Sequence, residues 1–246
     1  MSPLSGSSAA PSREDLDLYA EIYTNDPYER ENILTDTDYA ERCVRLATAP
    51  RRWLELGLGR GARLRRISEN SESVLALDGS PEIVSRHKGQ YPNVRIELTY
   101  FEDFETTERF QNIGMGFILE HVDDPRAILR KYRGMLAEGG SIFAAVPNAS
   151  SLHRLLGHRA GFLPDLHLLS ANDQRFGHKR FLTCAEWRAV FESEGLRIDR
   201  VEGLYLKPFT TTQMEKLELD PQVYRALLDI GRELPEIANS CLFVLK

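Results

Sequence analysis

An apolar strand runs directly into a glycine-rich turn at Trp53-Leu54-Glu55-Leu56-Gly57-Leu58-Gly59-Arg60-Gly61. Three alternate glycines permit backbone dihedrals that other residues avoid, and their missing side chains let a ligand approach the main chain closely. A helical pattern follows at once, so the turn joins a strand to a helix. The stretch therefore predicts a ligand crevice at the carboxyl end of a parallel sheet.

Short strand-like runs alternate with helical patterns on both sides of this turn. The predicted strands cover residues 52–56, 74–78, 94–98, 112–115 and 141–146. The predicted helices between them cover residues 62–69, 81–87 and 125–136, the last of them ended by Gly139 and Gly140. This alternation is typical of βαβ units and predicts a Rossmann-like, doubly wound α/β fold.

The flanking segments complete the expected fold. Helical spacing covers residues 14–23 and 36–47 before the first strand. After the fifth strand the pattern is broken over residues 148–181, apart from a short helical run at 152–156. Then follow a helix at 185–194, a strand at 196–204, a helix at 221–232 and a strand at 240–245. We expect seven strands in a mainly parallel sheet whose last strand is antiparallel, with an insertion after strand five.

Length and composition predict one domain. A chain of 246 residues can bury a single core. Residues 1–13 are rich in Ser, Ala and Pro and are expected to form a flexible leader. The domain would span residues 14–246: amino-terminal helices at 14–50, a cofactor-binding core at 51–147, a substrate lid at 148–181, and the remaining half of the sheet at 182–246.

Charge and cysteine content limit the class of protein. The formal net charge of −6 argues against a general affinity for nucleic acid or for anionic membranes. The three cysteines are far apart and lack a Cys-x-x-Cys spacing, which favours a reducing compartment over disulfides or a zinc site. No targeting or membrane-spanning pattern is visible. We therefore expect a cytoplasmic protein without nucleic-acid or membrane partners.

Two acidic residues narrow the ligand. Gly57, Gly59 and Ala62 also fit a variant of the dinucleotide fingerprint, so a nicotinamide enzyme is an alternative. Glu55 would repel a pyrophosphate, whereas it suits a ligand that carries an ammonium group. Asp78 ends the second strand, where a carboxylate can accept both hydroxyls of a ribose. The alternative role of Asp78 is that of a turn or helix-capping acid.

Three blocks of sequence resemble the class I S-adenosylmethionine-dependent methyltransferases, in particular the small-molecule branch that includes ubiquinone-biosynthesis-type enzymes. The blocks are the glycine turn from Glu55 to Gly61, the strand end at Asp78, and Ile118-Leu119-Glu120-His121-Val122-Asp123-Asp124-Pro125 followed by Leu136-Ala137-Glu138-Gly139-Gly140. The third block is more specific than the glycines. The resemblance implies an enzyme with S-adenosylmethionine as its cofactor.

The resemblance also implies a set of cofactor contacts. Glu55, Gly57, Gly59 and Gly61 would line the methionine part, and Asp78 beside Gly79 would bind the ribose. Adenine would lie near Phe101, Glu102 and Asp103. The family often has Asp where this chain has Tyr100, so a contact to the adenine amine would pass to Glu102 or Asp103, or be lost. The carbonyls of Met115 and Gly116 would meet the methionine amine. Tyr19 and Tyr23 would cover the cofactor or simply pack in their helix.

Methyl transfer from a sulfonium depends mainly on alignment and on the exclusion of water, and a base helps when the acceptor is a hydroxyl or an ammonium. His121, which follows the fourth strand, and His178 in the insertion are the candidate catalytic residues. The alternative role of His121 is to pin its loop by hydrogen bonds. Four histidines, His153, His158, His167 and His178, lie in the insertion, but none has a cysteine or carboxylate at a diagnostic spacing, so no metal site is expected.

The basic residues of the insertion bear on the acceptor. Arginines, lysine and histidines there favour a carboxylate, phosphate or nucleotide-bearing acceptor, and the alternative is a solvated basic loop. We expect methyl transfer to an oxygen or nitrogen of a small anionic or sugar or natural-product acceptor. The alternatives are methylation of a protein or tRNA, and a protein that binds S-adenosylmethionine without turnover. A homodimer is compatible with the sequence.

Overall fold

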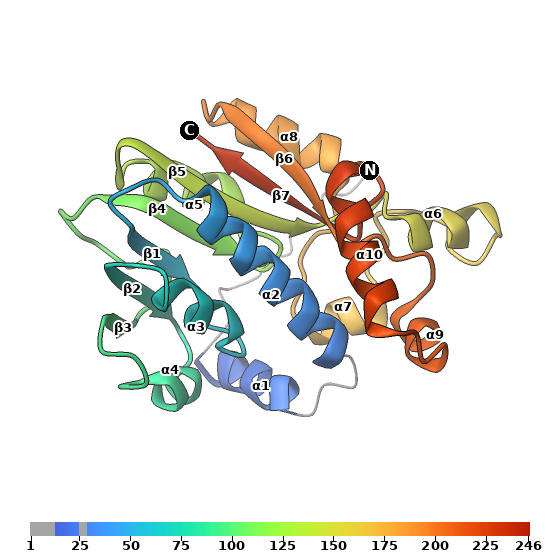
Figure 1. Ribbon diagram of the computed structural model, residues 1–246, viewed down its shortest axis with the longest axis horizontal. Coiled ribbons are helices and arrows are strands. Elements are labelled where there is room, and N and C mark those ends of the chain that lie inside the picture. Colours follow the sequence, from blue (N-terminus) through green and yellow to red (C-terminus); the bar gives the residue numbers. More distant parts are fainter. Residues whose placement is uncertain (1–12, 25–28) are drawn as a thin grey trace, which may run out of the picture.

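The computed structural model describes residues 13–24 and 29–246, and it contains a seven-stranded sheet (Figure 1). The strands lie in the order β3-β2-β1-β4-β5-β7-β6. Their bounds are β1 Arg52–Leu56, β2 Ser73–Asp78, β3 Val94–Leu98, β4 Phe110–Gly116, β5 Leu136–Pro147, β6 Ile198–Leu204 and β7 Ser240–Leu245. β7 is antiparallel to both β5 and β6, while β1 to β5 pair in parallel. The predicted mainly parallel Rossmann-like sheet is confirmed.

Helices connect the strands. Their bounds are α1 Arg13–Thr24, α2 Glu29–Leu46, α3 Ala62–Ser68, α4 Pro81–His87, α5 Pro125–Arg133, α6 Leu152–Arg159, α7 Ala171–Arg175, α8 Cys184–Ser193, α9 Thr211–Lys216 and α10 Pro221–Glu233. Within the described ranges, none of these helices is both long enough and apolar enough to cross a bilayer. The helix bounds near the glycine turn agree with the sequence pattern to within about two residues.

Both faces of the sheet are covered, because successive side chains of a strand point to opposite faces. On one face, Leu54 and Leu56 of β1 belong to an apolar cluster with residues of α5 and α8. On the other face, Trp53 joins a cluster with residues of α2, α3 and α4. Figure 1 shows α2 and α3 on the near face and α5 and α8 behind the sheet. Glu55 shares the side of Trp53, so it faces α2 and α3.

The prediction for the end of α5 is wrong. The helix ends at Arg133, and Gly134 closes it by donating its N–H to the Arg130 carbonyl. β5 then begins at Leu136 and runs through Gly139 and Gly140. Gly139 has φ +71°, and the register between β4 and β5 shifts in this region. The two glycines therefore form an irregularity inside the strand and do not stop a helix, because glycine serves β-bulges as well as helix ends.

Other boundaries also differ from the sequence pattern. α2 begins at Glu29, well before the predicted residue 36, and β6 begins at Ile198. α7 and α9 were not predicted, because helices of five and six residues are too short to show a period. The expected leader lies outside the described residues up to residue 12, and Arg13 already belongs to α1.

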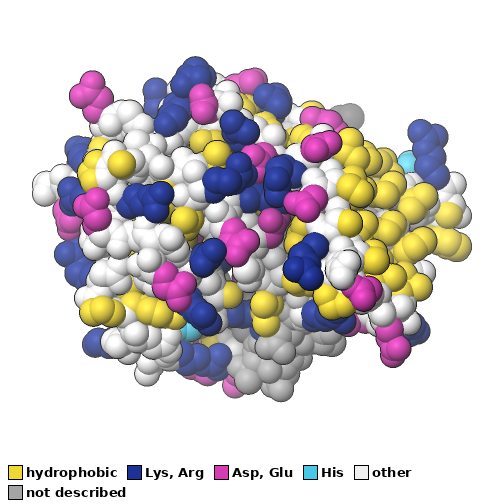
Figure 2. Space-filling model, viewed as in Figure 1, with side chains coloured by type: hydrophobic (Ala, Val, Ile, Leu, Met, Phe, Trp, Pro, Cys, Tyr) yellow, Lys and Arg dark blue, Asp and Glu magenta, His cyan; other side chains and the backbone are white. Residues whose placement is uncertain are grey.

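The expected insertion divides into two parts. Figure 1 shows α6 at the end of the molecule beside α9 and α10, away from the glycine turn between β1 and α3. Exposed apolar side chains gather at this end (Figure 2), among them Leu156 of α6, Val223 and Ile230 of α10, and Leu217, which directly follows α9. The later part, from α7 to Phe181, returns to the loop after β4. This later part contacts the loop after β4 through Lys179 and Arg180.

Candidate functional site

The glycine turn has the backbone that the sequence predicted. Gly57, Gly59 and Gly61 have φ of +78°, +51° and +82°, a region that L side chains rarely adopt. The Gly57 N–H donates to the Leu77 carbonyl at 2.8 Å, which ties the turn to the end of β2. The turn therefore lies at the carboxyl ends of β1 and β2, and the side chains of Ile118, Arg63 and His87 pack against Gly57, Gly59 and Gly61 respectively.

Asp78 is buried at the end of β2 and holds the turn in place. One carboxylate oxygen accepts the Leu58 N–H and the other accepts the Ser80 N–H, each at 2.9 Å. Burial raises the pKa of Asp78, and these two hydrogen bonds oppose the rise. The turn-supporting role that the sequence left open is thus present. Each oxygen has a second lone pair, so the carboxylate can still accept a ribose hydroxyl.

Glu55 is fully buried on the side of α2 and α3. Neither carboxylate oxygen has a hydrogen-bond partner in the part of the chain that the structure describes. Burial raises the Glu55 pKa to about 7, and the nearby Arg63 opposes that rise. A Cβ on Gly114 of β4 would lie 1.8 Å from Glu55 Oε2, so only glycine leaves room for this carboxyl group. An orphaned buried acceptor fits an ammonium donor.

Arg63 of α3 was not predicted as a site residue. Its side chain is buried, Nη1 donates to the Gly116 carbonyl at the end of β4, and Nε lies 3.7 Å from Asp36 Oδ1. The guanidinium carbon lies 5.9 Å from the ring centre of Tyr39. The carbonyl that the resemblance assigned to the methionine amine therefore already accepts a hydrogen bond from the protein.

The adenine end is less enclosed. Phe101 is half-buried beside Gly57, where a Cβ would lie 3.8 Å from the phenyl ring. Glu102 and Asp103 form an exposed turn, and the Glu102 carbonyl accepts a hydrogen bond from Lys131. Met115 is buried in the core. Thus the structure brings Phe101 to the glycine turn but leaves the two carboxylates at the surface.

Helix α1 covers the turn after β2. A Cβ on Gly79 would lie 2.7 Å from Leu16 Cδ1, and Ser80 Oγ donates to Asp17 Oδ1 at 2.6 Å. Tyr19 and Tyr23 belong to α1, but their side chains lie outside the described residues. Leu16 and Asp17 therefore attach α1 to the turn after β2, and the predicted role of Tyr19 and Tyr23 stays a prediction.

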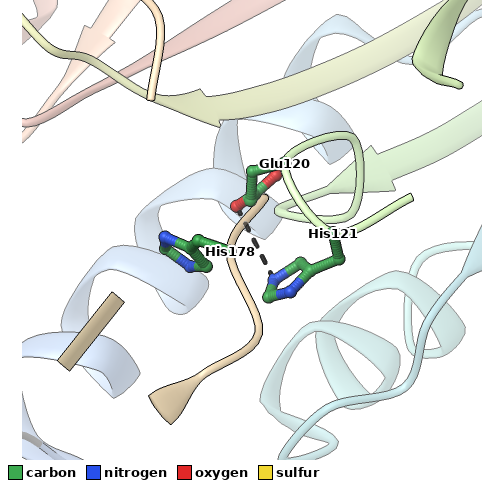
Figure 3. Close-up of side chains that lie close together, drawn as sticks. All are labelled: Glu120, His121 and His178. Carbon is green, nitrogen blue, oxygen red and sulfur yellow. Dashed lines mark ion pairs between the residues drawn. The ribbon is translucent and has the colours of Figure 1, made fainter. Parts of the chain in front are cut away.

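Three titratable side chains meet beyond the end of β4 (Figure 3). Glu120 and His121 come from the loop after β4, and His178 comes from the segment before α8. One ligand atom from each lies within 4.8 Å of the other two. His121 Nε2 is 4.0 Å from Glu120 Oε1, and the two imidazole centres are 4.8 Å apart. The two predicted catalytic histidines are brought together, with Glu120 as a third member.

The environment of this Glu120–His121–His178 cluster is mostly buried. Burial raises the Glu120 pKa to about 7, and its oxygens have no hydrogen-bond partner among the described residues. Burial, together with the charge of His178, lowers the His121 pKa to about 3. His178 Nδ1 lies 3.5 Å from Asp173 Oδ1. The cluster can accept a proton from a ligand, and its donor set could also hold a divalent cation.

Backbone contacts fix the cluster. The Lys179 N–H donates to the Glu120 carbonyl at 2.8 Å, and Arg180 donates to the Leu119 and Val122 carbonyls. Arg154 likewise donates to the Leu166 and Leu168 carbonyls. The guanidinium groups of Arg154 and Arg180, for which the sequence offered an anionic acceptor or a solvated basic loop, therefore hold the segment together.

Sequence signals existed for the unpredicted residues. Glu120 lies beside His121 in the Leu-Glu-His block, and Arg63 follows the last glycine of the turn by two positions. Both are charged residues close to apolar runs. Charged residues are rarely buried without a partner. The sequence does not show which groups they contact, because Asp36, the partner of Arg63, and His178, the neighbour of Glu120, are distant in sequence.

The fold and the crevice define a Rossmann-like methyltransferase, and comparison with known proteins agrees. The methyltransferase domain family matches residues 30–201, so the chain belongs to this family. It is a class I methyltransferase, and S-adenosylmethionine is its cofactor. The orphaned Glu55 carboxyl, the positive-φ glycine turn and Asp78 fit that cofactor.

Individual relatives are more distant. The chain is 28% identical over 172 residues to the ubiquinone biosynthesis O-methyltransferase of Xanthomonas euvesicatoria, covering 68% of this chain and 71% of the relative. Among solved structures, the DhpI–SAM–HEP complex has a TM-score of 0.61 at 17% identity, with 98% of this chain and 100% of the other covered. The N-methyltransferase NodS of Bradyrhizobium japonicum has a TM-score of 0.55 at 15% identity, with 94% and 96% covered. These two likenesses concern the fold.

Proposed function

We propose that the protein transfers the methyl group of S-adenosylmethionine to a hydroxyl oxygen of a small-molecule acceptor. The Glu120–His121–His178 cluster carries this proposal, because a hydroxyl must lose its proton when its oxygen is methylated. The names of the curated relatives support oxygen over nitrogen as the acceptor atom. The buried free cysteines support a cytoplasmic reaction.

Different residues of the crevice would bind different parts of the cofactor. Glu55 would accept a hydrogen bond from the methionine ammonium, the glycine turn would line the methionine chain, Asp78 would bind the ribose, and Phe101 would contact adenine. S-adenosylmethionine supplies a methyl group on a sulfonium, which is a good leaving group. The remaining contribution of the protein is to align the acceptor and to exclude water.

His178 would take the acceptor's proton. Asp173 lies beside His178 Nδ1, so it can orient the imidazole and stabilise its protonated form, as a carboxylate does in hydrolase triads. His121 would contact the acceptor hydroxyl from the other side of the cluster. In the sequence interpretation, residues 148–181 formed a substrate lid. We now assign that role only to the part from α7 to Phe181, which contacts the loop after β4.

A panel of acceptors tests the activity. Catechols, sugars, hydroxy acids, amines, a protein extract and bulk tRNA would each be incubated with S-adenosylmethionine, and S-adenosylhomocysteine and the methylated product would be measured. We expect turnover on a hydroxyl compound, and matched carboxylated and neutral versions would give the preferred charge. Methylation of amines alone, or of protein or tRNA alone, would contradict the proposal. Cofactor binding without turnover on any acceptor would instead indicate a non-catalytic binding protein.

The base role makes a separate prediction. His178→Asn should lower kcat about a hundredfold, the lower end of the range for general bases, while cofactor affinity stays unchanged. His158→Asn is the matched control, because this exposed histidine bonds through Nδ1 to the Leu163 carbonyl of its own loop, away from the Glu120–His121–His178 cluster. Activity should also survive EDTA. Loss of activity in EDTA and recovery with Zn²⁺ or Mn²⁺ would assign the cluster to a metal ion in place of the base role.

A further inference from the structure

Arg63 lies between the two halves of the cofactor crevice. A Cβ on Gly59 would lie 3.3 Å from its Nη2, and a Cβ on Gly116 would meet its Nη1. One side of the guanidinium therefore contacts the glycine turn, and the other contacts the end of β4. No larger residue than glycine fits at position 116 while Arg63 keeps this conformation.

The guanidinium is also the positive charge around which buried acids converge. Burial raises the pKa of four carboxyl groups, and the charge of Arg63 opposes the rise at each of them: Asp36, Glu55, Asp78 and Glu120. They come from α2, β1, β2 and the loop after β4. Arg63 thus partly neutralises a crevice that would otherwise collect several desolvated carboxyl groups.

The cofactor brings its own charges to the same place. S-adenosylmethionine carries an ammonium, a sulfonium and a carboxylate, and the first two suit the acids and the Gly116 carbonyl. A guanidinium that remained at this carbonyl would compete with the ammonium. The cofactor carboxylate offers it a better partner, because guanidinium and carboxylate pair through two parallel hydrogen bonds.

We propose that Arg63 turns away from the Gly116 carbonyl when S-adenosylmethionine binds, so that the cofactor's ammonium takes this carbonyl and the guanidinium pairs with the methionine carboxylate. Arg63 is thereby the residue that makes the protein require this carboxylate. The inference rests on the proposed cofactor contacts of Glu55 and the glycine turn. The Arg63 side chain alone would then distinguish S-adenosylmethionine from analogues that lack the carboxylate.

Binding of two ligands tests the inference without any turnover. The affinities of S-adenosylmethionine and of its decarboxylated analogue would be measured by calorimetry for the wild type, Arg63→Met and Arg63→Lys. Arg63→Met should weaken S-adenosylmethionine about 30-fold, as expected for a hydrogen-bonded charge pair, and leave the analogue within about threefold of wild type or tighter. Arg63→Lys should fall between wild type and Arg63→Met, because lysine keeps the charge without the planar fork.

Two controls locate the effect. Arg66→Met removes an exposed arginine of the same helix, which pairs with Glu41 and Glu69, and should leave both affinities unchanged. Arg60→Met tests the other nearby cation, which lines a cavity of about 520 Å³ between the glycine turn and α4. Circular dichroism and thermal unfolding would confirm that each variant folds. If Arg63→Met does not fold, the ratio of the two affinities in Arg63→Lys decides in its place.

Several results would overturn the inference. They are equal affinities of the wild type for both ligands, an equal loss of both in Arg63→Met, and a loss of carboxylate preference in Arg60→Met instead. A wild type that binds neither ligand would contradict the proposed cofactor contacts themselves. A wild type that binds S-adenosylmethionine with the expected preference but methylates no acceptor would contradict only the proposed function. The failures of the two proposals are therefore distinguishable.

Discussion

Glu55→Gln is expected to weaken S-adenosylmethionine binding by about a hundredfold at alkaline pH, the upper range for a hydrogen bond to a charged group. Glutamine keeps the size of the side chain, which Gly114 barely accommodates, but it loses the negative charge. The ammonium of the cofactor would then meet a neutral amide. Calorimetric titration of the ligand measures the loss directly.

The same substitution should stabilise the ligand-free protein at alkaline pH. The Glu55 pKa is raised from 4.5 to about 7 in the folded state, so folding favours the neutral acid. Protonated Glu55 gives the folded protein its full stability below pH 4.5. This stability falls as the pH rises towards 7. Above pH 7 the free energy of unfolding is lower than at pH 4.5 by a constant amount of up to about 3 kcal/mol. Glutamine removes that loss. Urea unfolding at about pH 8 and near pH 4.5 should show a difference only at the higher pH.

Cofactor affinity of the wild type should depend on pH in the opposite sense. Below pH 7 Glu55 takes up a proton and loses its attraction for the ammonium, so affinity should fall as the solution is acidified. Glu55→Gln should lack this dependence. Glu97→Gln, which changes an exposed carboxylate on β3 paired with Arg95, is the matched control. Wild-type affinity in Glu55→Gln would mean that this carboxyl has no contact with the cofactor.

Asn148→Ala is expected to destabilise the protein by about 3 kcal/mol or more, because it removes the hydrogen bonds to the buried Ala238 carbonyl and the buried Cys184 N–H along with several part-buried ones. Asn148 is fully buried just after β5. Its Nδ2 donates to the carbonyls of Pro235, Glu236 and Ala238 at 3.0–3.2 Å. Its Oδ1 accepts the Cys184 N–H at 3.1 Å and two hydrogen bonds from Ser150. One side chain thus joins β5, α8 and the segment before β7.

Urea denaturation would measure the effect on the free energy of unfolding. Asn239→Ala is the control, since this half-buried side chain donates one long hydrogen bond of 3.4 Å to Ser240, and its loss should cost within about 0.5 kcal/mol. We also expect Asn148→Ala to loosen the segment that carries His178 and so to lower kcat. An unfolding free energy equal to that of wild type would show that water replaces these contacts at no cost.

Local patterns predicted the strands well and the longer helices moderately. β1, β3 and β7 match their predicted ranges because apolar β-branched and aromatic runs are bounded by turn residues. The sequence was misleading at Gly139 and Gly140, where glycines usually end a helix but here form an irregularity in β5. The sequence pattern did not predict α7. This helix begins with a capping box between Ser170 and Asp173, but it is too short to show the period of apolar residues that marks a helix.

The sequence by itself determined the sheet, the glycine turn, the class of cofactor and the two candidate histidines, because each depends on residues that are close together in the chain. Only the tertiary structure decided which charges meet. It placed Arg63 between β1 and β4, grouped Glu120 with both histidines, and turned Arg154 and Arg180 of the insertion toward protein carbonyls. The glycine turn could therefore be predicted from local sequence, whereas burial and long-range pairing decided which buried side chains have no partner among the described residues.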